Sequence, residues 1–224
     1  HWRINWSAIT GLVRVGLPIG VHYVLDMGSF LVFSAYVGRM GTEQLAANQI
    51  VIQVLALSFM PCPGFSVAAT TLVGQYIGAG FQDLAKKSAY SAIRLGLTYA
   101  VFIGLVYVIF PEQLVKIFNS DPAVVSFGKK IVYLAAVFQI FDALQMVAAG
   151  GLRGAGDTRT PMIFAIGGGW FVFLPFAYLL GSVFDGGVVG AWGGATIYIV
   201  FLGIAMFLWL KTDRWKRIKL EQPV

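Results

Sequence analysis

About six long apolar runs follow one another along this chain, and they restrict its fold more than any other feature. One of them, LTYAVFIGLVYVIF at 97–110, contains no charged residue. A helix of about 20 residues crosses a hydrocarbon core of about 30 Å and satisfies its own backbone hydrogen bonds in lipid. Only 12% of the 224 residues are charged, whereas soluble proteins carry roughly a quarter. The pattern predicts an all-α integral membrane protein, a bundle of six transmembrane helices.

The predicted spans form a single six-helix transmembrane lobe, 1–224, without an additional soluble domain. They cover residues 16–37, 45–78, 88–110, 131–152, 161–184 and 187–210. The second is too long for a straight crossing, because at 1.5 Å per residue it would exceed about 45 Å. Pro61 and Pro63 interrupt it, so we expect a bend or break near Pro61. Pro161 predicts the start of a helix capped by the Thr160 hydroxyl.

The distribution of Lys and Arg predicts the orientation in the membrane. Of the 16 basic residues, twelve fall on the side of both predicted ends and four on the other side. Cytoplasmic loops carry the excess of positive charge, so both termini are expected in the cytoplasm, and residues 211–224 form a basic cytoplasmic tail beside anionic lipid. Because these charges stand at the ends of apolar runs and do not alternate with aromatic residues on one polar surface, nucleic acid is not an expected partner.

Two of the ten acidic residues, Asp26 and Asp142, lie inside predicted spans. Each is about ten residues into its span, which places both near the middle of the bilayer. A carboxylate at a helix centre costs roughly 2.5–3.5 kcal/mol on insertion scales, so each must be protonated, paired or solvated. If the two carboxyl groups shared one proton and only held the bundle together, this insertion cost would be offset. Ionisable groups inside membranes more often mark an ion or substrate route, however, and such a pair can exchange a proton or hold a hard monovalent cation.

Polar residues accompany both acids at helical spacing. His22 precedes Asp26 by one turn, while Gln139, Asp142 and Gln145 follow one another at intervals of three. Two polar stripes that face one another are therefore predicted. Packing between helices explains a lone His or Gln equally well.

Motifs for enzymatic chemistry are not evident in the sequence. GAG at 154–156 follows no predicted strand, so it does not indicate a phosphate-binding loop. The single cysteine, Cys62, stands between two prolines and matches no metal-ligand spacing. Neither an enzyme nor a cofactor is expected, because no nucleophile with an adjacent base and no cluster of metal ligands is evident.

Five segments, in this order, resemble the multidrug and toxic compound extrusion (MATE) family, specifically the C-terminal six-helix lobe of its bacterial NorM-like branch. They are GLPIG (16–20), GTEQLAANQI (41–50), FMPCPGFSVAATTLVGQYIGAG (59–80), VFQIFDALQ (137–145) and GGLRGAGDTRTPM (150–162). The resemblance covers nearly the whole chain. Several collinear motifs at plausible spacing are more specific than any one alone.

The resemblance implies one lobe of a twelve-helix transporter in the bacterial inner (plasma) membrane, which exports organic cations and amphipathic compounds against inward H+ or Na+. The N-terminal lobe of the same transporter would be its partner. The acid eight residues after Pro18 corresponds to Asp26, and the acid of the Phe-Gln-x-x-Asp-Ala stretch corresponds to Asp142. Some members carry Tyr one turn before that second acid, where this chain has Phe138.

The two intramembrane acids and their polar neighbours form the expected site. Asp26 and Asp142 are expected to bind the coupling ion, H+ or Na+, and the cationic substrate, and to form any Na+ site. The residues expected to line the cavity are His22, Gln53, Phe138, Gln139, Phe141 and Gln145.

Two alternatives remain open at this stage. A lipid-linked oligosaccharide flippase of related architecture should show more Arg and Lys in the cavity to meet phosphates. A non-transporting membrane scaffold, or a channel, would leave the paired acids unexplained, and it would gain support if neutralising both acids changed stability but not flux.

Overall fold

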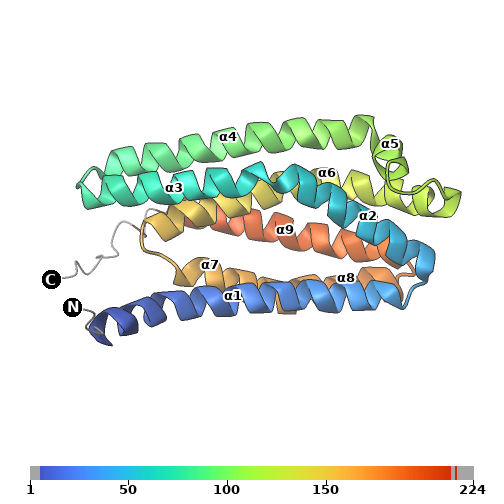
Figure 1. Ribbon diagram of the computed structural model, residues 1–224, viewed down its shortest axis with the longest axis horizontal. Coiled ribbons are helices and arrows are strands. Elements are labelled where there is room, and N and C mark those ends of the chain that lie inside the picture. The colour runs from blue at the N-terminus through green and yellow to red at the C-terminus, as the bar shows by residue number, and fades with distance from the viewer. Residues whose placement is uncertain (1–5, 213–214, 216–224) are drawn as a thin grey trace, which may run out of the picture.

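The computed structural model describes the chain path over residues 6–212 and at Trp215. Within the first helix, the side chains at 6–16, 18, 19, 22, 23 and 26 lie outside the described residues. All regular structure in the described part is helical, and the long helices run side by side along one axis (Figure 1). The elements are α1 (Trp6–Gly38), α2 (Thr42–Phe59), α3 (Pro61–Gly78), α4 (Gln82–Ile109), α5 (Pro111–Lys116), α6 (Pro122–Gly154), α7 (Arg159–Gly168), η1 (Gly169–Phe173), α8 (Leu174–Tyr178), η2 (Leu179–Val183) and α9 (Gly187–Lys211).

Several of these helices have the length and composition of membrane spans. Within the described residues, α4, α6, the continuous stretch 159–183 and α9 are each long and apolar enough to cross a bilayer, and α2 with α3 meets the same test as a bent pair. The all-helical membrane fold is therefore confirmed. The predicted span 16–37 includes several side chains outside the described residues and stays a prediction.

The predicted break near Pro61 is present. α2 ends at Phe59, α3 begins at Pro61, and the two helices meet at an angle of 44°. The last carbonyls of a helix have no partner within it, and in lipid they need another donor. The Tyr99 hydroxyl of α4 donates to the Ser58 carbonyl at 2.6 Å. A side chain from the neighbouring helix thus stabilises the bend.

The fourth span is longer than predicted. α6 begins at Pro122, whereas the sequence pattern placed the start of the span at 131. Asp121 caps it, because its Oδ1 accepts the Ala123 N–H at 2.8 Å, and Pro122 occupies the first turn, where its missing N–H costs nothing. The cap extends the helix past the apolar run.

The predicted Thr160 cap of the fifth span is wrong. α7 begins at Arg159, and the Thr160 hydroxyl makes no capping bond there. Asp157 has that role instead, because its Oδ1 accepts the Thr160 N–H at 3.0 Å while its Oδ2 accepts Trp209 Nε1 at 2.9 Å. Asp157 is 6% exposed. Its carboxylate therefore joins the α6–α7 turn to the end of α9.

The fifth span is not a regular α-helix. Two π-helical segments, η1 and η2, flank the short α8, which begins beside Pro175. A π-helical turn adds a residue and rotates the side chains that follow. The hydrophobic pattern gives no sign of these insertions.

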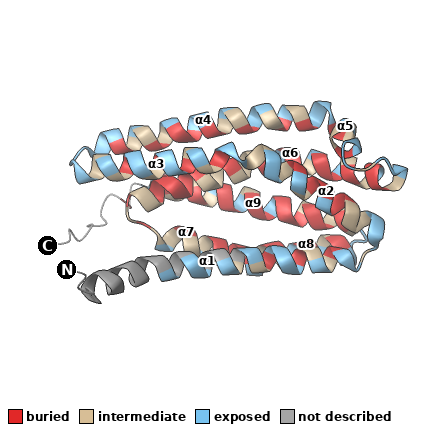
Figure 2. Cartoon of the chain, in the orientation of Figure 1, coloured by how far each residue is buried: buried red, intermediate tan, exposed pale blue. Residues whose placement is uncertain are grey.

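α6 and α9 form the centre of the bundle. α6 packs against α9, α4 and α3, and buried residues run along α6 and α9 while α1 and α4 show exposed outer faces (Figure 2). Glycines allow the closest approaches. A Cβ at Gly150 would lie 2.6 Å from the Ser66 carbonyl oxygen on α3, and one at Gly194 would lie 2.6 Å from Ala177 Cα on α8. Small residues permit such backbone contacts between membrane helices.

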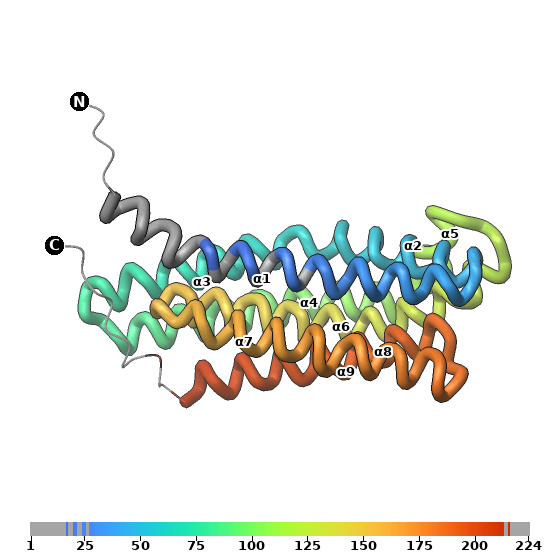
Figure 3. Tube along the Cα trace, turned by 90° about the horizontal axis from the view of Figure 1, so that it is seen from below, coloured from blue at the N-terminus to red at the C-terminus, as the bar shows by residue number. Residues whose placement is uncertain are grey.

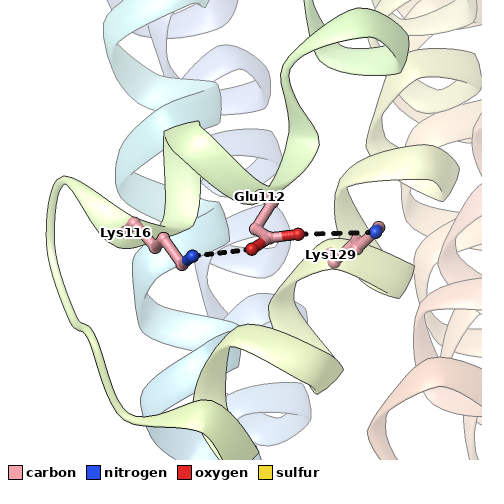
Figure 4. A network of polar contacts seen from close by, with 3 residues as sticks. All are labelled: Glu112, Lys116 and Lys129. Atoms are coloured by element: carbon pink, nitrogen blue, oxygen red, sulfur yellow. Dashed lines mark ion pairs between the residues drawn. The ribbon is translucent and has the colours of Figure 1, made fainter.

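α1 begins and α9 ends at the same end of the bundle (Figure 1). Figure 3 shows from a second side that α9 ends there. At the opposite end, α5 folds back against α6. Lys116 Nζ forms an ion pair with Glu112 Oε1 at 2.7 Å, and Lys129 Nζ forms a second one with Glu112 Oε2 at 3.6 Å (Figure 4). Lys116 first, and Lys129 second, hold the pKa of the Glu112 carboxyl below its usual value. All three side chains are at least partly exposed to solvent, so the contribution to stability is small.

Candidate functional site

A cavity of about 450 Å³ opens between α1, α2, α6, the α7–η1 stretch and α9. Helix α6 supplies most of its polar wall. Gln139, Asp142, Gln145 and Arg153 all line it. These residues recur at near-helical intervals, so they lie along one side of α6.

Aromatic rings form much of the remaining wall. Phe138 and Trp192 meet edge to face with centroids 5.9 Å apart, and Phe173 stacks on Tyr198 at 5.6 Å with 22° between the planes. Ring faces attract cations, and ring edges pack against apolar ligands. The cavity therefore combines an acidic group with broad aromatic surfaces.

A buried hydrogen bond holds Trp192 in place. Its Nε1 donates to Asn48 Oδ1 on α2 at 2.9 Å, and both residues are buried. The Phe33 ring of α1 meets the same indole edge to face at 6.0 Å. Three helices thus fix the orientation of one cavity wall.

The structure brings four of the predicted site residues together. Asp142, Gln139, Gln145 and Phe138 all lie in the cavity wall. Asp142 is half-buried. Gln139 is 0% exposed, and within the described part of the chain neither of its amide atoms has a hydrogen-bond partner.

The other predicted residues lie elsewhere. Gln53 is exposed on α2, and Phe141 packs with its backbone against Gly203 of α9; neither lines the cavity. Asp26 and His22 belong to α1, but their side chains lie outside the described residues. Met27, next to Asp26 along the chain, does line the cavity.

Sequence reasoning missed Arg153 and much of the aromatic wall. Arg153 lines the cavity near the end of α6, and its Nε donates to the Ala149 carbonyl at 3.2 Å. It lies eleven residues beyond Asp142, about 16 Å along the helix axis. Eleven residues are about three helical turns, so the helical period counted from Asp142 would have placed Arg153 on the same side of α6. Trp192 and Tyr198 carry no such signal, because their span is apolar on all sides.

In the described part of the chain, no group of three or more His, Cys, Asp and Glu side chains could hold a metal ion.

The sequence matches the family described as MatE over residues 18–179. This chain belongs to the MatE family. The predicted resemblance is thereby confirmed, and with it the expectation of a transporter family rather than an enzyme family.

Similar sequences are NorM-like. The probable multidrug resistance protein NorM of Brucella suis is 37% identical over 221 residues, which are 96% of this chain and 46% of that protein. The corresponding protein of Thermotoga maritima is 34% identical over 213 residues, which are 95% of this chain and 46% of that protein. This chain therefore spans about half the length of these bacterial relatives.

Solved structures share the fold. An outward-facing multidrug resistance MATE family transporter of the MOP superfamily has a TM-score of 0.84 at 21% identity, covering 95% of this chain and 48% of its own. An inward-facing one has a TM-score of 0.83 at 18% identity, covering 97% and 51%. A MOP superfamily transporter from Pyrococcus furiosus, with a TM-score of 0.84 at 21% identity, has a binding pocket of reverse polarity that suggests a different function for that protein. Cavity residues, beyond the fold, must therefore indicate the ligand.

Proposed function

We propose that the protein containing this chain is a cation-coupled multidrug efflux antiporter, and that this chain forms one of its two six-helix lobes. The observation that carries the proposal is Asp142 in a cavity walled by Phe138, Trp192 and Tyr198. A carboxylate held among aromatic faces attracts organic cations, and an intramembrane carboxylate also binds protons or cations. The NorM relatives support drug-like substrates.

Coupling would follow from competition for the same carboxylates. The inward-moving ion and the outward-moving cation would both neutralise Asp26 and Asp142, so each would displace the other. Phe138 supplies no hydroxyl oxygen to an ion beside Asp142, which favours H+ over Na+.

The polar wall fits the alternatives less well. A flippase for lipid-linked oligosaccharides should present several basic groups to the phosphates, whereas Arg153 alone supplies a basic group among the described residues of this wall. A scaffold or channel gives no role to Asp142 beside the Gln139 amide, which no described residue pairs with.

Flux measurements in liposomes test the proposal directly. With the complete transporter reconstituted, an imposed pH gradient without Na+ should move tetraphenylphosphonium against its concentration gradient. An imposed Na+ gradient at constant pH should have little effect. Failure of both gradients to drive the cation would contradict antiport, while drive by Na+ alone would reverse the assignment of the ion.

The proposed location is the bacterial inner membrane, with both termini in the cytoplasm. The shared end of α1 and α9 and the excess of basic residues there support this orientation. Cysteines introduced at Asp121 and Asp185 should react with an impermeant thiol reagent added to intact cells, and one at Lys216 should not. The native Cys62 is buried, so its background labelling should be low. The opposite labelling pattern would invert the proposed topology.

A further inference from the structure

Gln139 is an unusual component of the cavity wall. Its side chain is completely buried, its Oε1 and Nε2 both lack hydrogen-bond partners within the described part of the chain, and it lines the cavity. Buried polar groups are almost always hydrogen-bonded, and an unpaired one carries its full desolvation penalty. This amide belongs to the cavity wall, so a ligand in the cavity could supply the partner that it lacks.

The described groups near Gln139 do not fill that role. Phe138, its neighbour in the wall, has no polar atom. The Trp192 N–H is already donated to Asn48 Oδ1 at 2.9 Å. No described residue therefore pairs with either amide atom.

The two unpaired atoms restrict the chemistry of that ligand. Oε1 accepts, so a proton donor or a cation can satisfy it. Nε2 donates two protons and requires an acceptor. A bare cation or an ammonium group can satisfy only the first atom, whereas a carboxamide, lactam or urea offers a donor and an acceptor on one edge and satisfies both.

The position of Asp142 adds a second requirement. It follows Gln139 by three residues on the same side of α6, where Cβ atoms are about 5–6 Å apart. A positive charge beside Asp142 would therefore lie within a few bonds of a group at Gln139. Aromatic rings such as Trp192 and Tyr198 offer flat surfaces in the same cavity.

We infer that Gln139 is the hydrogen-bonding anchor of the cavity and that it selects, among aromatic cations, those carrying a paired donor and acceptor next to the charge. This inference rests on the proposed function, because it assumes that the cavity takes organic cations. It adds a specificity that charge and hydrophobicity alone would not produce.

Three matched probes separate these contributions. 1-Benzyl-3-carbamoylpyridinium carries the charge, two rings and a donor–acceptor edge. 1-Benzyl-3-acetylpyridinium keeps the acceptor but loses the donor, and 1-benzyl-3-ethylpyridinium loses both. Binding to the complete transporter, measured by calorimetry, should favour the carbamoyl compound over the ethyl compound about tenfold, with the acetyl compound between them.

Gln139→Met should remove this preference. Methionine is unbranched and of similar size, so it fills the same space without an amide. The variant should bind all three probes with the affinity that the wild type shows for the ethyl compound. Its melting temperature without ligand should be unchanged or higher, because a buried unpaired amide has been removed. Gln75→Met makes the same chemical change at an exposed position of α3 outside the cavity, and it should retain the preference.

Each contrary result has a distinct meaning. If no probe binds the wild type, this inference and the proposed cationic substrates both fail. If the wild type binds all three probes equally, ordered water satisfies the amide, and the inference fails while the proposed function stands. If Gln139→Met weakens all three probes alike and lowers the melting temperature, Gln139 is a packing residue and the inference is overturned.

Discussion

Replacing both Asp26 and Asp142 by asparagine in the complete transporter should abolish ion-driven efflux, while folding and membrane insertion survive. Asparagine keeps the size and the hydrogen bonding of the side chain but removes the titratable charge. Without that charge, the site no longer attracts the coupling ion or the cationic drug, so the two no longer compete for it. Uphill efflux from liposomes should fall to the level of empty liposomes under both a pH gradient and a Na+ gradient.

The single variants sharpen this experiment. Each should lose most of the efflux alone, and the losses should not add, because the second substitution acts on a pair already broken. Asp83→Asn, an exposed acid in the first turn of α4, serves as the matched control and should transport normally. Normal uphill efflux by the double variant, with unchanged responses to both gradients, would refute the coupling scheme.

Gly194→Ala should destabilise the protein severely, by about 3 kcal/mol. A Cβ at this position would lie 2.6 Å from Ala177 Cα and 2.6 Å from the Phe176 carbonyl carbon. Backbone atoms cannot rotate away as a side chain can, so α9 and α8 would have to separate along their contact. The loss should appear as a large drop in melting temperature in detergent and in the yield of monodisperse protein.

Gly167→Ala provides the control for this substitution. Gly167 lies in α7, and a Cβ there meets nothing within 4 Å. Alanine is also the better helix former, so this variant should melt at the same temperature as the wild type or slightly higher. Equal melting temperatures for the two variants would show that α8 and α9 are not in the close contact described.

The sequence was sufficient to predict the parts of the fold that depend on chain-local chemistry. Apolar runs long enough to cross a bilayer must be helical, and Pro61 interrupts a helix because it lacks a backbone N–H. Both expectations hold. The prediction of a Thr160 cap failed because Asp157, three residues earlier, accepts the Thr160 N–H. Asp157 prevailed through its second hydrogen bond, to Trp209, a residue 52 positions away that no local pattern indicates.

The residues of the candidate site also differ in how far the sequence could predict them. Asp142 could be predicted because a carboxylate in an apolar run has few explanations, and Gln139 and Gln145 followed from helical spacing. Gln53 has a comparable sequence environment but is exposed on α2. Trp192 was missed because its place in the wall depends on Asn48, from another helix. Which side of an apolar helix faces a cavity is set by tertiary packing, to which its composition gives no guide.

The placement of Asp142 and Arg153 on one side of α6 gives the cavity an electrical direction. When Asp142 is ionised, a cation travelling along this wall leaves a repelling guanidinium and approaches an attracting carboxylate about 16 Å away. At an effective dielectric constant of about 20, a unit charge still interacts with another about 16 Å away by about 1 kcal/mol, and more strongly at shorter distances. Arg153 stands in the last turn of α6, and α6 ends at the end of the bundle where α1 begins and α9 ends (Figure 1). In the proposed orientation, the slope draws cations from the cytoplasmic side towards the middle of the bilayer, and protonation of Asp142 flattens it.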